Sequence, residues 1–191
     1  ASNSPWFNAV CPHPPYCWGY DFNHEKQATK DYVDRVTTFW LQEYRIDGIR
    51  FDYTKGFMNG SAGASAVRQA IIKRIGDTIW SVNPNAHLIL EHWADNSEEK
   101  ALADYGFMLW GNSTYNFHQA GQGNTQSNFS WAYHGARGWT KPGLVSYPES
   151  HDEERPFFKA AQYGNGSLGS GLGERIHRST LNVAFNTMLD G

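Results

Sequence analysis

Two charged residues lie two positions apart in a short apolar run, "DGIRFDYTKGF", residues 47–57. Side chains two apart along a β-strand project from the same face, so Arg50 and Asp52 would lie side by side if this run is a strand. Charged groups are seldom buried without a partner. The spacing therefore predicts either a structural ion pair or part of an active site.

Acidic residues also follow two later apolar runs. Glu91 ends "HLILE", and Asp152, preceded by His151, follows "GLVSYPES". In α/β folds, active sites form outside the carboxyl ends of the strands, where these residues and Asp52 would lie. A purely structural role would scatter acidic residues among helix faces and turns. We therefore favour a catalytic interpretation.

The elements that would position these residues alternate along the chain. Apolar residues at steps of three and four predict helices at 26–44, 67–82, 98–105 and 174–189, with part of 116–134 also helical. Four short apolar runs between them predict strands at 47–52, 87–92, 106–111 and 143–148. Strands that are apolar on both faces and alternate with helices predict a parallel sheet, in half of a (β/α)8 barrel or in a doubly wound fold.

Composition limits the class of protein. A chain of 191 residues is about one domain, and its net charge of −3 without a basic cluster argues against nucleic-acid binding. No apolar run approaches the roughly 18 residues of a membrane span. Aromatic residues make up 15% of the chain, which fits either a large core or a sugar-binding cleft.

The two cysteines lie in "CPHPPYC". Cys11 and Cys17 could close a disulfide in an oxidising compartment, remain free thiols, or bind a metal together with His13. The sequence leaves these three alternatives open.

The acidic residues and their neighbours closely resemble the α-amylase family, glycoside hydrolase family 13. Its fingerprint G-x-R-x-D after barrel strand 4 is matched in "GIRFD", its glutamate after strand 5 in "LILEHWAD", and its His-Asp pair after strand 7 in "YPESHDEER". Each match alone is weak, but all three occur in the family's order. The resemblance implies an α/β fold, a partial (β/α)8 TIM barrel comprising about strands 4 to 7.

The resemblance also implies roles for the acidic residues. Asp52 would be the nucleophile, Glu91 the general acid/base and Asp152 the transition-state stabiliser. Arg50 would keep Asp52 ionised, since a nearby cation lowers the pKa of a carboxyl group. These residue types suit a retaining glycosidase, whose two carboxyls lie about 5–5.5 Å apart.

Further family positions suggest contacts with sugar and with calcium. Arg50, Lys55, Trp93 and His151 are expected to bind substrate. Asp21 in "GYDFNHE" and the backbone carbonyl of Gly56 match positions that bind a structural calcium in the family, and such oxygens suit calcium. Asp21 could instead cap a turn before the first helix. Gly56 also replaces the family's usual histidine.

The match to the family is incomplete. The family's D-x-x-x-N-H motif of strand 3 is absent, so 1–24 are interpreted as the end of the excursion after strand 3 and 25–191 as the partial barrel. An open half barrel exposes two sheet edges. We therefore expect a fragment, a shortened form, or a chain completed by other barrel segments or by self-association. Secretion or periplasmic export is expected, with any signal peptide outside this chain.

The sequence thus predicts a retaining hydrolase that cleaves α-1,4 bonds in starch-like or glycogen-like α-glucans. A glucan-branching or other transglycosylating enzyme would share the same carboxylates and differ in its acceptor. A catalytically inert glucan-binding fragment is the alternative of another class.

Overall fold

The computed structural model describes residues 3–12, 14, 19–58 and 65–189. The chain divides into two compact units, Ala1–Leu109 and Trp110–Gly191, and each is described by itself. The domain boundary predicted after residue 24 stays a prediction. A pairing of Cys11 with Cys17 and a metal site with His13 lie outside the described residues, because positions 13 and 17 are not among them.

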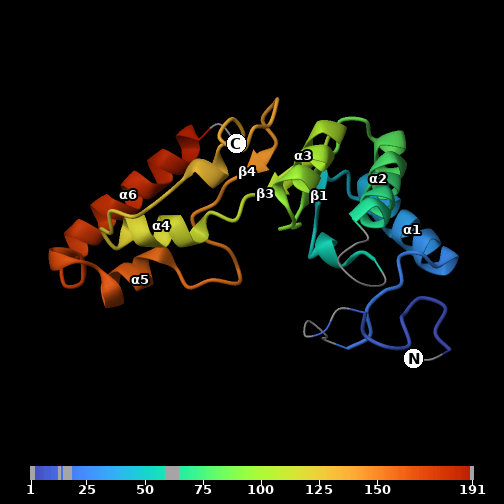
Figure 1. Ribbon diagram of the computed structural model, residues 1–191, viewed down its shortest axis with the longest axis horizontal. Coiled ribbons are helices and arrows are strands. Elements are labelled where there is room, and N and C mark those ends of the chain that lie inside the picture. The colour runs from blue at the N-terminus through green and yellow to red at the C-terminus, as the bar shows by residue number, and fades with distance from the viewer. Residues whose placement is uncertain (1–2, 13, 15–18, 59–64, 190–191) are drawn as a thin grey trace. The chain divides into compact units, whose positions relative to one another are not determined.

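The first unit alternates helices with the strands of a parallel sheet (Figure 1). Residues Gly48–Phe51 of β1 pair with His87–Leu90 of β2, whose Ile89 and Leu90 pair in turn with Met108 and Leu109 of β3. The α/β class predicted from the alternating pattern is confirmed. The elements, close to their predicted bounds, are α1 (Gln27–Glu43), β1 (Gly48–Phe51), α2 (Ser65–Val82), β2 (His87–Leu90), α3 (Asn96–Tyr105) and β3 (Met108–Trp110), whose last residue is the first of the second unit.

The core of the first unit lies between α2 and the sheet. Ile72, Ile75 and Ile79 recur at helical spacing on α2 and are all buried. Leu88 and Leu90 lie two apart on β2, share one face of the sheet and are also buried. Each such side chain contributes roughly 1.5–3 kcal/mol on full burial, so this layer holds α2 against the sheet.

The three helices of the second unit contact one another, and one aromatic residue is fully buried among its elements. Phe117 of α4 is fully buried, its ring centroid lies 4.8 Å from that of Phe129, and its carbonyl accepts a hydrogen bond from Asn182. The Gly111 amide donates to the carbonyl of Val145 at 2.9 Å. The elements are α4 (Thr114–Gly121), β4 (Leu144–Val145), α5 (Pro156–Tyr163) and α6 (Leu172–Met188).

The sequence prediction for this unit was less complete. Helix α5 was not predicted, although Pro156 occupies a first-turn position that suits proline. The strand predicted at 143–148 shortens to β4, and α4 occupies only the beginning of 116–134. None of the helices within the described residues is long and apolar enough to cross a bilayer.

Gly76 of α2 tests the packing between this helix and the sheet. A Cβ at this position would lie 2.5 Å from Cζ of Phe107 and 2.9 Å from Cζ3 of Trp80. Overpacking costs about 1–3 kcal/mol, more than the gain of up to about 1 kcal/mol from replacing a helical glycine by alanine. We expect Gly76→Ala to lower the free energy of unfolding in urea.

Gly173→Ala in α6 is the matched control, because nothing lies within 4 Å of a Cβ built there. This variant should leave the free energy of unfolding unchanged or raise it slightly. Equal effects of the two substitutions would contradict the packing described for Gly76.

Candidate active site

Arg50 links two carboxylates that follow β1 and β2. Its Nη1 lies 2.5 Å from Oδ1 of Asp52, and its Nη2 lies 2.7 Å from Oε2 of Glu91. The Asp52 side chain is 74% exposed, whereas that of Glu91 is 6% exposed. The forked guanidinium is suited to grip two carboxylates at once. One cation is therefore shared between an open carboxylate and a buried one.

The parallel register of the sheet brings these groups together. Phe51 and Leu90 are partners at the ends of β1 and β2, and the next residue of each strand is Asp52 or Glu91. The Glu91 amide donates to the carbonyl of Phe51 at 3.0 Å, which extends the pairing by one bond. Parallel strands end at the same edge of a sheet. The structure thus assembles Arg50, Asp52 and Glu91, and their chemical roles stay predictions.

The two carboxylates differ in their affinity for a proton. Burial raises the pKa of Glu91 above its usual value, and a hydrogen bond with the Asp52 carboxyl raises it further. The Tyr53 amide and the Arg50 charge act in the opposite direction. Two carboxyls can share a hydrogen bond only when one is protonated, and desolvation favours the proton on Glu91. The pair can therefore present a proton donor beside an ionised, exposed carboxylate.

A tight turn after β1 holds Glu91. Tyr53 has a φ of 43°, in the left-handed region, and its amide donates to Oε2 of Glu91 at 3.0 Å. The Thr54 amide donates to the Glu91 carbonyl at 2.9 Å, and the Thr54 hydroxyl oxygen lies 3.0 Å from the same carbonyl oxygen. Left-handed conformations are uncommon outside glycine and persist where the surroundings fix them. The turn thus binds both the backbone carbonyl and the side-chain carboxyl of Glu91.

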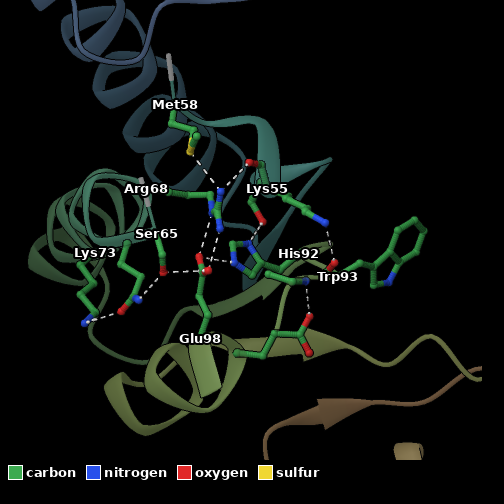
Figure 2. Close-up of polar contacts among 12 residues, drawn as sticks. Lys55, Met58, Ser65, Arg68, Lys73, His92, Trp93 and Glu98 are labelled. Carbon is green, nitrogen blue, oxygen red and sulfur yellow. Dashed lines mark hydrogen bonds and ion pairs between the residues drawn. The ribbon is translucent and has the colours of Figure 1, made fainter. Parts of the chain in front are cut away.

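A buried polar cluster lies against this turn (Figure 2). His92 Nδ1 is 2.9 Å from the Thr54 hydroxyl, and His92 Nε2 is 2.9 Å from Oε1 of Glu98. Arg68 donates to both oxygens of Glu98, at 2.8 and 2.6 Å, and the Ser65 hydroxyl donates to Oε2 at 2.8 Å. The cluster connects the turn after β1 to both α2 and α3.

The charges in this cluster are balanced. Burial alone would raise the pKa of Glu98, but hydrogen bonds from Arg68, Ser65 and His92 outweigh it and hold that pKa below its usual value. Burial lowers the pKa of His92, although the hydrogen bond to Glu98 opposes this shift. Both pKa shifts are consistent with an ionised Glu98 that pairs with Arg68 and with a neutral His92.

The sequence analysis did not identify Arg68, His92 or Glu98. A signal was present in part, since Arg68 lies four residues before Ile72 on the apolar face of α2, and Glu98 four before Leu102 on α3. A charge within an apolar stripe predicts a buried partner. The partner itself follows only from the packing of α2 against α3.

Lys55 and Trp93, expected to bind substrate, lie together in the first unit. Lys55 Nζ donates to the Trp93 carbonyl at 3.3 Å, and Lys55 is exposed. Trp93 has a φ of 50°, and Figure 2 shows its indole directed away from the buried cluster. Their contacts with sugar stay predictions.

His151 and Asp152 lie in the second unit, after β4. His151 Nε2 is 3.4 Å from Oδ1 of Asp152, and the two side chains are 63% and 55% exposed. The His151 ring stacks beside Trp110, with centroids 6.1 Å apart, and Trp110 packs on Tyr147 at 4.4 Å. The side chains of His151 and Asp152 thus contact each other. A site that combines Asp152 with Asp52 and Glu91 stays a prediction.

The expected calcium ligands do not form a recognisable donor set. The Gly56 carbonyl accepts a hydrogen bond from the Met58 amide at 2.8 Å, and the Asp21 carboxylate lies 3.8 Å from Sγ of Cys11. No cluster of three or more His, Cys, Asp or Glu suited to a metal occurs in the described part of the chain. Calcium at Asp21 and Gly56 stays a prediction, and no chemical step is derived from it.

Solved structures share the fold of this chain. Pullulanase of Bacillus subtilis complexed with maltose matches 97% of the chain with a TM-score of 0.66 and 18% identity. Pullulanase of Anoxybacillus sp. complexed with maltotriose matches 94% with a TM-score of 0.63 and 18% identity, and apo pullulanase of Klebsiella pneumoniae matches 91% with a TM-score of 0.61 and 15% identity. No protein-family profile and no curated protein matches the sequence.

The extent of these matches limits what they establish. The chain spans 29%, 28% and 24% of those three pullulanase chains, respectively. At such identities the similarity establishes the fold alone. The chain therefore has the α/β fold of a segment of these pullulanases, and its assignment to barrel strands 4 to 7 stays a prediction.

Removing Arg68 tests the buried cluster. Arg68→Met leaves Glu98 buried without its cation, which typically costs about 3–5 kcal/mol. Arg74→Met is the control, because Arg74 pairs with Asp34 at 2.8 Å while their side chains are 33% and 32% exposed. Such a pair contributes about 0–1 kcal/mol. Urea denaturation should show a much larger loss for Arg68→Met, and similar small losses would contradict the buried ion pair.

Proposed function

We propose that the protein is a glycoside hydrolase of the α-amylase type that acts on α-glucans with retention of configuration. Asp52 serves as the nucleophile and Glu91 as the general acid/base. The observation that carries this proposal is the pair of unequal carboxylates held by Arg50, one exposed and one buried with a raised pKa. Pairs whose environments separate their pKa values mark acid and nucleophile assignments.

The proposed reaction has two steps. Asp52 attacks the anomeric carbon while Glu91 gives its proton to the departing glycosidic oxygen, which leaves a glycosyl ester on Asp52. Glu91, now ionised, then takes a proton from a water that attacks the same carbon and releases Asp52. Arg50 keeps Asp52 ionised and positioned. Arg50 lies 2.5 Å from the Asp52 carboxylate and 2.7 Å from that of Glu91, and this shared contact keeps the two carboxyls close, which supports retention, since inverting pairs lie roughly 6.5–9.5 Å apart.

The substrate class is proposed from the structural neighbours together with the family resemblance. Pullulanases of this fold have been solved with maltose, maltotriose and maltotetraose. These ligands are short α-1,4-linked glucans, and they support an α-glucan substrate here. Lys55, Trp93 and His151 are the proposed sugar contacts, and Asp152 is the proposed transition-state stabiliser.

Turnover of a chromogenic maltooligosaccharide tests the nucleophile. Asp52→Asn should lower kcat by about 1,000-fold or more, because an amide cannot form the glycosyl ester. Asp104→Asn is the control, since Asp104 is exposed on α3 and pairs with Lys100. It should retain the activity of the unmodified protein. Undiminished turnover in Asp52→Asn would contradict the proposal.

The products distinguish the alternatives. Short linear oligosaccharides from amylose would support α-1,4 hydrolysis, whereas attack on pullulan but not on amylose would place the cleaved bond at α-1,6. New α-1,6 links in amylose would favour a branching enzyme. Glucan binding without any turnover would favour the inert glucan-binding alternative.

A further inference from the structure

The Glu91 carboxyl is held by an amide whose direction depends on an uncommon backbone conformation. Tyr53 adopts a φ of 43°, and this geometry points its N–H at Oε2 of Glu91, 3.0 Å away. A side chain in the left-handed region crowds its own backbone, so such a residue reverts to an ordinary conformation unless its surroundings prevent it. The position of the Glu91 carboxyl therefore depends on whatever holds the turn.

Thr54 holds the turn from the next position. Its side chain is fully buried, and its amide and hydroxyl both lie within hydrogen-bond distance of the Glu91 carbonyl. The same hydroxyl is 2.9 Å from Nδ1 of His92, which follows Glu91 in the chain. Thr54 thus joins the turn after β1 to the segment after β2.

The proton count shows how His92 fixes this hydroxyl. Ionised Glu98 can only accept, so Nε2 of His92 carries a proton and donates to it. Nδ1 of the neutral ring then has a free lone pair that accepts the Thr54 hydroxyl proton. The Glu91 carbonyl keeps the bond from the Thr54 amide in this arrangement. His92 is held at both nitrogens, with Glu98 from α3 and the charges of Arg68 and Lys55 around it.

We infer that His92, acting through Thr54, is a positioning residue for the proposed acid Glu91. The chain His92–Thr54–Tyr53 fixes the turn whose amide orients the Glu91 carboxyl. The inference rests on the function proposed above for its catalytic meaning.

Two pairs of variants separate the hydroxyl contact from general packing. Thr54→Val removes the hydroxyl with little change of shape, and Thr54→Ser keeps it. His92→Gln keeps a donor that reaches Glu98 but loses the group at Nδ1, whereas His92→Asn places its amide near Nδ1. Thr37→Val is the control, because Thr37 is a buried threonine whose hydroxyl bonds within α1.

Kinetics should separate positioning from stability. Thr54→Val and His92→Gln should lower kcat by roughly ten- to a hundredfold with little change in KM, since small displacements of a reacting group are costly. Thr54→Ser and His92→Asn should recover much of that loss. Thr37→Val should leave kcat unchanged.

The pH dependence supplies a second readout with a defined sign. The Tyr53 amide lowers the pKa of Glu91, so loosening the turn should raise that pKa. The acid must be protonated to act, and the alkaline limb of kcat/KM should therefore move to higher pH in Thr54→Val. Asp52 and Arg50, the charged groups that face Glu91, are unchanged in this variant. A purely structural effect would lower activity equally at every pH.

An NMR titration of protein labelled at the glutamate carboxyl carbons makes the test independent of activity. A higher pKa of Glu91 in Thr54→Val and His92→Gln supports the inference, even if the unmodified protein shows no turnover and the proposed function fails. A folded Thr54→Val variant with an unchanged Glu91 pKa overturns the inference, whatever its activity.

Discussion

The candidate site depends on one guanidinium shared by two carboxylates. Asp52 and Glu91 would repel each other if both were charged, because both lie within 3 Å of the same guanidinium. Arg50, in contact with both, offsets this repulsion. The guanidinium reaches both groups only because β1 and β2 are parallel and end in register. The two ion pairs of Arg50 therefore require that β1 and β2 run parallel.

The turns next to these carboxylates are strained in a similar way. Tyr53 directly follows Asp52 and Trp93 lies two residues after Glu91, and both have φ in the left-handed region. Such conformations often occur at functional sites, where surrounding contacts maintain them. At Tyr53 these contacts lead through Thr54 and His92 to the Glu98–Arg68 pair. Arg45, also left-handed, lies before β1, and no role for it follows from the structure.

The sequence predicted those features that depend on local periodicity. The two-residue spacing of Arg50 and Asp52 predicted that their side chains lie together. The alternation of apolar runs predicted the α/β class and the elements of the first unit. Helix α5 was missed because it is short and carries exposed aromatic residues, Phe157 and Phe158, which do not mark a buried face.

The buried cluster could not be predicted in the same way. Arg68 and Glu98 lie 30 residues apart in the chain and meet only because α2 packs beside α3. Their periodic positions could have indicated that each was buried, but not that His92 would join Glu98 to the turn after β1. The roles of Asp52, Glu91 and Asp152 came from the family resemblance, and the geometry supports the first two as a pair.

The central claim is that Asp52 attacks the sugar while Glu91 supplies the proton. A fluorinated α-glucosyl fluoride tests the attack by Asp52 directly, because its leaving group departs without help from an acid while the ring fluorine slows release of the glycosyl ester. Mass spectrometry of the protein after incubation should show one added glycosyl group, located by peptide mapping on Asp52. An adduct on another carboxylate, or no adduct at all, would contradict the account.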